Sequence, residues 1–258
     1  MCLCLSAGCV FKPAICRSRS IWGLLRAVGW GGLFQPSPFQ STGQVNFLAS
    51  STIGIGGVAS TGPRQDFTIK ELSYATWPDF EKLAMKQGPC WCIYYQRPRP
   101  VRGKFSTAER GKMNKKAKEA LVQQGRSHAA LVYDGRIPIG WCQYGPREEL
   151  PRIDAGRNYK KLEPVSGSKK LWRITCFFVD KDYRGQGVAR TALKGALESI
   201  RKQGGGIVEA YPVVSKNLSK VAEWMWFGSP SMFRRERFKP ISPLGTSYHL
   251  MRRTVLPS

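Results

Sequence analysis

Two glycines separated by one residue lie between an apolar segment and a segment with helical spacing, in the stretch CFFVDKDYRGQGVARTAL at residues 176–193. Gly185 and Gly187 have no Cβ atom, so the backbone there can adopt positive φ angles and approach a ligand closely. The first amides of the following helix can donate hydrogen bonds, and the helix dipole favours an anion at that end. Arg184 adds a positive charge. This combination is typical of a phosphate-binding turn, although a tight connection without a ligand would use the same glycines.

The segments around the turn predict a strand, a helix and a second strand. LWRITCFFV at 171–179 is an almost continuous apolar run, as expected for a central strand covered on both faces. Apolar residues then recur with helical spacing from Val188 to Ile200, and the three glycines at 204–206 end this helix. IVEAYPVV at 207–214 predicts another buried strand. The turn therefore lies where a strand becomes a helix.

The preceding residues continue this alternation of strands and helices. FTIKEL at 67–72 and CWCIYYQ at 90–96 are candidate strands, and two apolar runs joined at Asp134 and Gly135 predict a hairpin. Ser106 and Glu109 have the spacing of a capping box at the start of a helix. The expected buried face of that helix consists of Met113, Ala117, Ala120 and Leu121.

The chain is strongly basic. Its 258 residues include 41 Lys and Arg against 17 Asp and Glu, a net charge of +24. Residues 1–65 contain five basic and no acidic residues, which leaves 36 basic and 17 acidic residues, or +19, on residues 66–258. Such a charge favours polyanionic partners, RNA among them, but it is equally compatible with a basic surface of no special role.

Residues 1–65 differ from the rest in composition. They are rich in Gly, Ser and Pro and show no sustained helical or strand period. Their most apolar segment, residues 21–34, is too short and too interrupted to span a membrane. We favour a disordered extension or a mis-assigned start over a targeting peptide, and expect the folded domain to cover residues 66–258.

Four cysteines fall in the expected domain: Cys90, Cys92, Cys142 and Cys176. Their spacing matches no secreted disulfide framework, so we expect free thiols, a reducing compartment and a cytoplasmic protein. Cys90 and Cys92 would share one face of the strand expected at 90–96, but C-x-C is not the usual zinc spacing, and we predict no metal site.

FFVDKDYRGQGVARTALKGAL at 177–197 resembles the acyl-CoA-binding motif of the GNAT N-acetyltransferase superfamily. SPSMFRRERFKPI at 229–241 is similar to the helix and strand that close this fold, and CWCIYYQ and WRITCFFV are similar to bacterial-type members whose substrates are mostly unassigned. The resemblance implies an α/β (α+β) fold, with a central mixed β-sheet flanked by helices, and acetyl-CoA as co-substrate. The implied cofactor-binding residues are Phe177, Phe178, Val179, Arg184, Gly185, Gln186, Gly187, Val188 and Ala189.

The implied reaction moves an acetyl group from the thioester to a primary amine by direct attack. Glu209 is the candidate base for the amine, with an ion pair to an arginine as the alternative role. Backbone amides from Phe177 to Val179 would stabilise the oxyanion. The sequence departs from the family pattern at three positions, Asp182, Phe233 and Arg237.

Phe233 matters most for chemistry, because it stands where the family often has the tyrosine that protonates the leaving thiolate. Tyr211 or Tyr248 could take that role. Two other functions stay open beside the enzyme: a CoA-binding module that is catalytically weak, and a basic protein associated with RNA or the ribosome. The acceptor cannot be read from the sequence, but its specificity should lie in residues 96–104, 145–170 and 215–229.

Overall fold

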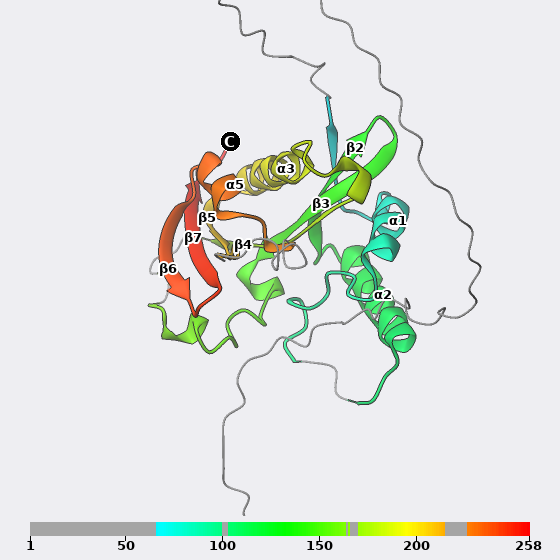
Figure 1. The fold of residues 1–258 in the computed structure, drawn as a ribbon, viewed down its shortest axis with the longest axis horizontal. Helices are drawn as coiled ribbons and strands as arrows, with labels where there is room; N and C mark the ends of the chain where they lie inside the picture. The colour runs from blue at the N-terminus through cyan, green and yellow to red at the C-terminus, as the bar shows by residue number, and fades with distance from the viewer. Residues whose placement is uncertain (1–65, 100–102, 164, 166–169, 215–225) are drawn as a thin grey trace, which may run out of the picture. The chain divides into compact units, whose positions relative to one another are not determined.

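The computed structural model describes residues 66–99, 103–163, 165, 170–214 and 226–258, and these belong to one compact unit. The expectation for residues 1–65 lies outside these ranges, as does most of the proposed specificity segment 215–229. The described residues form a seven-stranded sheet in the order β1-β2-β3-β4-β5-β7-β6 (Figure 1). All neighbouring strands are antiparallel except β4 and β5, which are parallel. The predicted mixed sheet with flanking helices is confirmed.

The strands are β1 Thr68–Glu71, β2 His128–Asp134, β3 Ile137–Pro146, β4 Leu171–Val179, β5 Gly206–Ala210, β6 Lys239–Leu244 and β7 Tyr248–Val255. The helices are α1 Trp77–Gln87, α2 Thr107–Gln123, α3 Val188–Lys202 and α5 Pro230–Arg235. Short 3-10 helices within the described ranges are η1 Arg147–Glu149, η2 Tyr159–Lys161 and η3 Lys181–Tyr183. No helix in these described ranges has the length and apolar character that crossing a membrane requires.

Helix α3 covers one face of the sheet and forms the largest apolar cluster with it (Figure 1). Ala192, Leu193 and Ala196 are fully buried there, as their helical spacing predicts. Gly195 lets the helix approach closely, because a Cβ atom at this position would lie 2.8 Å from a methyl carbon of Ile69. The strand, glycine turn and helix that the sequence predicts are therefore packed as one unit.

Helix α2 has the predicted capping box, with the Ser106 side chain accepting from the Glu109 amide at 3.2 Å. Its expected buried face is wrong. The buried residues are Asn114, Lys118 and Val122, whereas Met113 is 38% exposed. Polar contacts explain the difference, because Asn114 Nδ2 donates to the carbonyl of Pro89 at 2.7 Å and so ties the helix to the segment that precedes it.

The strand expected at residues 90–96 is also absent, and turns occupy this part of the chain instead. Trp91 and Cys92 have φ angles of 52° and 48°, which no strand residue adopts. Trp91 stacks on Trp77 of α1 with ring centroids 6.1 Å apart, so its burial comes from packing against a helix. As a result Cys90 is exposed and Cys92 is buried, and they do not share a face.

Candidate active site

Among the described residues, no strand pairs with one edge of β4 over its second half. Its parallel pairing with β5 runs only from Leu171 to Ile174. At the same point the pairing with β3 shifts by one residue, so that Gln143 lies opposite Cys176 and Tyr144 opposite Ile174. Thr175 is the extra residue of this β-bulge. From Thr175 onward, the described residues pair β4 only with β3.

The amides of Phe177 and Val179 lie on this open edge. The amide of Asp180 donates to the carbonyl of Ile139 on β3 at 2.8 Å, and the hydrogen-bonding groups of successive strand residues point to opposite sides. The backbone amide of Phe178 therefore points toward β3, while the backbone amides of Phe177 and Val179 point away from it. This places two of the three predicted strand residues with their amides available to a ligand.

The open edge leads directly into the glycine turn. Gly185 and Gly187 have φ angles of 79° and 85°, and Gly187 is the residue at which α3 begins. Within the described residues, none of the amides from Gly185 to Arg190 donates a hydrogen bond; the first that does is Thr191, to the carbonyl of Gly187 at 3.0 Å. The turn and the first turn of α3 thus present a row of free donors, as the sequence predicts for an anion site.

Basic side chains lie next to Asp180 and at the start of the turn. The carboxylate of Asp180, 6% exposed, is paired with Lys86 of α1 at 2.5 Å. This hydrogen bond lowers the pKa of Asp180. Arg184 is exposed, and its Nε atom contacts the carbonyl of Val179 at 3.5 Å. Lys86 therefore compensates the buried carboxylate, and the Arg184 side chain lies against the last residue of β4, Val179.

Glu209, the candidate base, is fully buried on the face opposite α3. Its Oε2 atom accepts from the hydroxyls of Tyr159 at 2.7 Å and Tyr211 at 2.8 Å. Its Oε1 atom accepts from Nε of Arg252 at 2.8 Å, and Nε of Arg173 lies 3.9 Å from Oε2. The arginine pairing that the sequence left open is therefore present.

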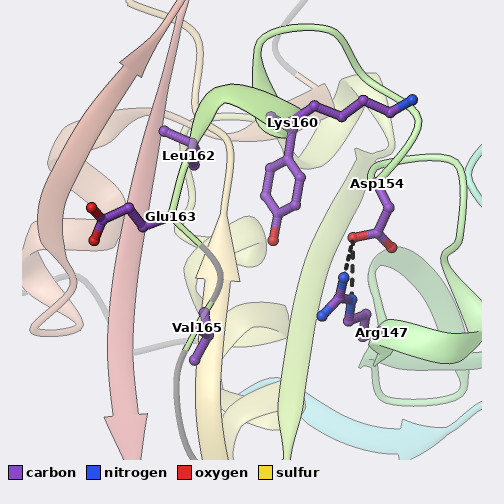
Figure 2. Close-up of a pocket in the computed structure, with 7 residues that line it drawn as sticks. Arg147, Asp154, Lys160, Leu162, Glu163 and Val165 are labelled. Atoms are coloured by element: carbon purple, nitrogen blue, oxygen red, sulfur yellow. Dashed lines mark hydrogen bonds and ion pairs between the residues drawn. The ribbon is translucent and has the colours of Figure 1, made fainter.

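Arg173 links Glu209 to a second carboxylate. Its guanidinium is fully buried and donates to both oxygens of Asp154 at 2.7 and 2.9 Å. Asp154 also faces Arg147 (Figure 2), and Nη2 of Arg147 lies 3.0 Å from Oδ1 of Asp154. Both residues line a cavity of about 160 Å³, together with Lys160 and Glu163. Two of the charged residues lining this cavity, Arg147 and Asp154, are paired with each other. The cavity therefore borders the buried network of Asp154, Arg173 and Glu209.

Phe233, which stands at the family's tyrosine position, and the two candidate acids Tyr211 and Tyr248 differ in their surroundings. Phe233 of α5 is fully buried against Phe177 and Phe238 and offers no proton. Burial and the charge of Glu209 raise the pKa of Tyr211 far above its usual value, and its proton is directed at Glu209. Tyr248 lies where β7 bridges to Val213 beyond the end of β5, and within the described residues its hydroxyl has no hydrogen-bond partner. Tyr248 is therefore the freer of the two tyrosines.

Two features near β4 escape sequence reasoning. Lys118 is fully buried and donates to the side-chain oxygens of Gln96 and Gln143 at 2.9 and 3.0 Å. Burial lowers its pKa from 10.5 to about 8. Cys92 and Cys176 meet with their sulfur atoms 2.8 Å apart. Both depend on the irregular segment at 88–99, whose path no local pattern specifies.

No metal site accompanies these groups. Across the residues that the structure describes, no three His, Cys, Asp or Glu side chains come together in a way that could hold an ion. His128 lies instead against Tyr144, with ring centroids 5.6 Å apart, and pairs with Glu149 at 3.2 Å. The histidine thus has a structural environment.

A comparison with protein families adds a decisive observation to this geometry. The model of the acetyltransferase (GNAT) family matches residues 77–224, which include the open edge of β4, the glycine turn and Glu209. The chain belongs to the GNAT acetyltransferase family. Members of this family use acetyl-CoA as co-substrate. A comparison with curated proteins gives no match.

Solved structures of GNAT proteins are similar to this chain at low identity. A histone acetyltransferase HPA2 and related acetyltransferase from Corynebacterium glutamicum is 14% identical, with a TM-score of 0.43 and coverage of 74% of this chain and 97% of that one. An N-acetyltransferase from Staphylococcus aureus is 11% identical, with a TM-score of 0.39 and coverage of 74% and 98%. Arabidopsis thaliana NAA60 in complex with acetyl-CoA is 16% identical, with a TM-score of 0.39 and coverage of 74% and 100%.

Proposed function

We propose that this GNAT protein is an N-acetyltransferase that moves the acetyl group of acetyl-CoA to a primary amine by direct attack on the thioester. The observation that carries the proposal is the open edge of β4, which begins at the Thr175 bulge and runs into a turn whose amides are free. One continuous row of donors can therefore hold the chain of the co-substrate and its pyrophosphate. The cofactor-binding residues are those named from the sequence, Phe177–Val179 and Arg184–Ala189.

Attack on the thioester creates a tetrahedral intermediate with a negatively charged oxygen. The amides of Phe177 and Val179 face the open edge and are preorganised by the pairing of β4 with β3. Fixed donors of this kind stabilise an oxyanion without reorganising during the reaction. In this proposal the strand holds the thioester and supplies the oxyanion hole, and no side chain is needed for that step.

The amine must be neutral before it attacks, and Glu209 is our proposed proton acceptor. Because the carboxylate is fully buried, it does not touch the acceptor, and the proton passes through the hydroxyl of Tyr211 or Tyr159. Arg252 donates to the other carboxylate oxygen and so holds Oε2 toward these hydroxyls. Glu209 thus acts as a relay residue, and its ion pairs are part of that role.

The leaving group is a thiolate with an ordinary pKa near 8.5, so protonating it helps less than activating the amine does. Phe233 cannot supply the proton. We propose Tyr248, whose ring packs on Phe227 at 5.4 Å and whose hydroxyl is not engaged elsewhere among the described residues. If Tyr248 has this role, Tyr248→Phe should lower kcat while leaving KM for acetyl-CoA unchanged.

The direct test is an amine screen with the full chain. Acetyl-CoA is supplied with polyamines, amino-acid amines, lysine peptides and peptides with free N-termini, and both CoA release and acetylated product are measured. Product with any amine class supports the proposal and names the acceptor class. Binding of acetyl-CoA without product in every class would instead favour the catalytically weak CoA-binding module. The cytoplasmic location inferred from the free thiols belongs to the same proposal.

The relay is tested by the pH profile of kcat/KM in Glu209→Gln. If Glu209 takes up the proton, the acidic limb of the profile disappears and the rate falls by about 10²–10⁴. Asp154→Asn is the matched control, because it disturbs the other partner of Arg173 without touching the hydroxyls. An unchanged pH profile in a folded Glu209→Gln variant would mean that Glu209 takes up no proton during the reaction and serves only in its ion pairs.

A further inference from the structure

Two cysteines from distant parts of the chain meet beside the open edge of β4. Cys92 comes from the segment between α1 and α2, and Cys176 from β4, one residue before Phe177. Their sulfur atoms lie 2.8 Å apart, although the residues are 84 positions apart in the sequence. The pair is therefore made by the fold, and the remaining gap to a disulfide bond of roughly 2.05 Å is about 0.8 Å.

The surroundings of this pair differ from those of an inert buried thiol. The side-chain nitrogen Nε2 of Gln87 lies 3.5 Å from Sγ of Cys92 and 3.8 Å from Sγ of Cys176. Burial opposes a thiolate at Cys92, but hydrogen bonding by Cys176 and the positive charge of Lys118 outweigh it, so the pKa of Cys92 is lowered. By contrast, burial raises the pKa of Cys142 far above its usual value.

We propose that Cys92 and Cys176 form a reversible oxidation site, in which a small two-electron oxidant of the hydroperoxide class converts the two thiols to a disulfide. This proposal rests on the short distance between the two sulfur atoms and on the Gln87 side chain that contacts both of them. Both thiols also lie on the same side of β4. It is independent of which amine accepts the acetyl group. Exposed Cys90 lies only two residues from Cys92 but is not the partner in this site.

The oxidation proceeds in two balanced steps. The thiolate of Cys92 attacks one oxygen of hydrogen peroxide, the O–O bond breaks, and the released hydroxide takes a proton to become water. The thiol of Cys176 then attacks the sulfenic sulfur of Cys92, forming the S–S bond and releasing a second water. Two thiols lose two electrons and two protons, and one peroxide becomes two waters. Thiols such as dithiothreitol reverse the reaction by exchange.

Peptide mapping of the full chain tests the site. The folded protein is treated with stoichiometric hydrogen peroxide, remaining thiols are alkylated, and the protein is digested with trypsin. Cys176 falls in the peptide of residues 174–181 and Cys92 in that of residues 87–102. We expect these two peptides to appear joined, lighter by two hydrogen atoms than their sum, and to separate again after dithiothreitol.

Single variants identify the sulfur atoms and control for nonspecific oxidation. Cys92→Ser and Cys176→Ser should both lose the joined peptide, whereas Cys90→Ser and Cys142→Ser should keep it. Cys142 is the matched buried control, because it lies in the α3-facing core away from the pair. A folded wild-type chain that gives no joined peptide, or a joined peptide that persists in Cys92→Ser, overturns the proposal.

Discussion

The clearest prediction concerns the two glycines of the turn, changed together as Gly185→Ala and Gly187→Ala. Both have positive φ angles, and an added Cβ atom would meet nothing within 4 Å at either position. The substitutions therefore introduce backbone strain without a steric clash. A left-handed conformation costs an alanine about 1–2 kcal/mol, so the double variant carries about 2–4 kcal/mol if the turn keeps its shape.

An exposed turn can relieve this strain by rotating a peptide group, and that rotation removes an amide from the pyrophosphate. A hydrogen bond to a charged group contributes about 1.5–3 kcal/mol. Losing one such bond should weaken acetyl-CoA binding by about 10-fold to 150-fold, because 1.4 kcal/mol corresponds to a factor of ten. The loss of affinity, more than the loss of stability, is specific to this site.

The matched control is the double variant Gly125→Ala and Gly204→Ala. These glycines have φ angles of 68° and 94°, are equally free of neighbours within 4 Å, and lie after α2 and α3, away from the turn. Calorimetric titration of acetyl-CoA into each full-length variant gives Kd, and urea unfolding gives the stability. We expect comparable destabilisation in both and weaker binding only in the turn variant. Equal Kd values in the two folded variants would refute the assignment of the pyrophosphate site.

Three further predictions concern buried groups. Glu209→Gln should lower the free energy of unfolding by about 3–5 kcal/mol in urea titrations, because it removes the buried carboxylate that pairs with Arg252 and leaves Arg173 with Asp154 alone. Lys118→Met tests the lowered pKa of Lys118. Between pH 8 and 10 the unfolded wild type binds a proton at Lys118 that the folded chain does not bind. The free energy of unfolding of the wild type should therefore rise by up to about 3 kcal/mol relative to that of the variant as pH increases over this range. A constant difference across this range would mean that the pKa is not lowered. Phe233→Ala should cost about 3–5 kcal/mol by thermal or urea unfolding, as expected for a fully buried aromatic side chain.

The sequence predicts well where local pattern and packing agree. Strand β4 and helix α3 have the expected ranges, because a continuous apolar run and a 3.6-residue period each demand a particular burial. The hairpin at Asp134 and Gly135 is confirmed for the same reason, since Gly135 adopts the positive φ angle, 56°, that the tight turn needs. In these places one local choice determines the structure.

Prediction fails where distant residues decide. The run CWCIYYQ has the composition of a strand, yet Trp91 and Cys92 take positive φ angles because they pack against α1 and β4. Lys118 is a charged residue that the sequence alone would place at the surface, but it is buried and donates hydrogen bonds to the side chains of Gln96 and Gln143. Propensity cannot anticipate either outcome, because both depend on partners far along the chain.

The bulge at Thr175 explains how one strand can serve both the core and the site. Side chains alternate along a strand, so one inserted residue exchanges the faces that follow it. Ile174 and Phe177 consequently face α3 together, while Arg173 and Cys176 face the opposite side. The pairing of β4 with β5 ends at the same point, just before Thr175. Side chains of β4 therefore pack against α3 both before and after the bulge, although one edge of the strand is free after it. A regular strand could open the edge but would turn Phe177 away from the core that holds the turn in place.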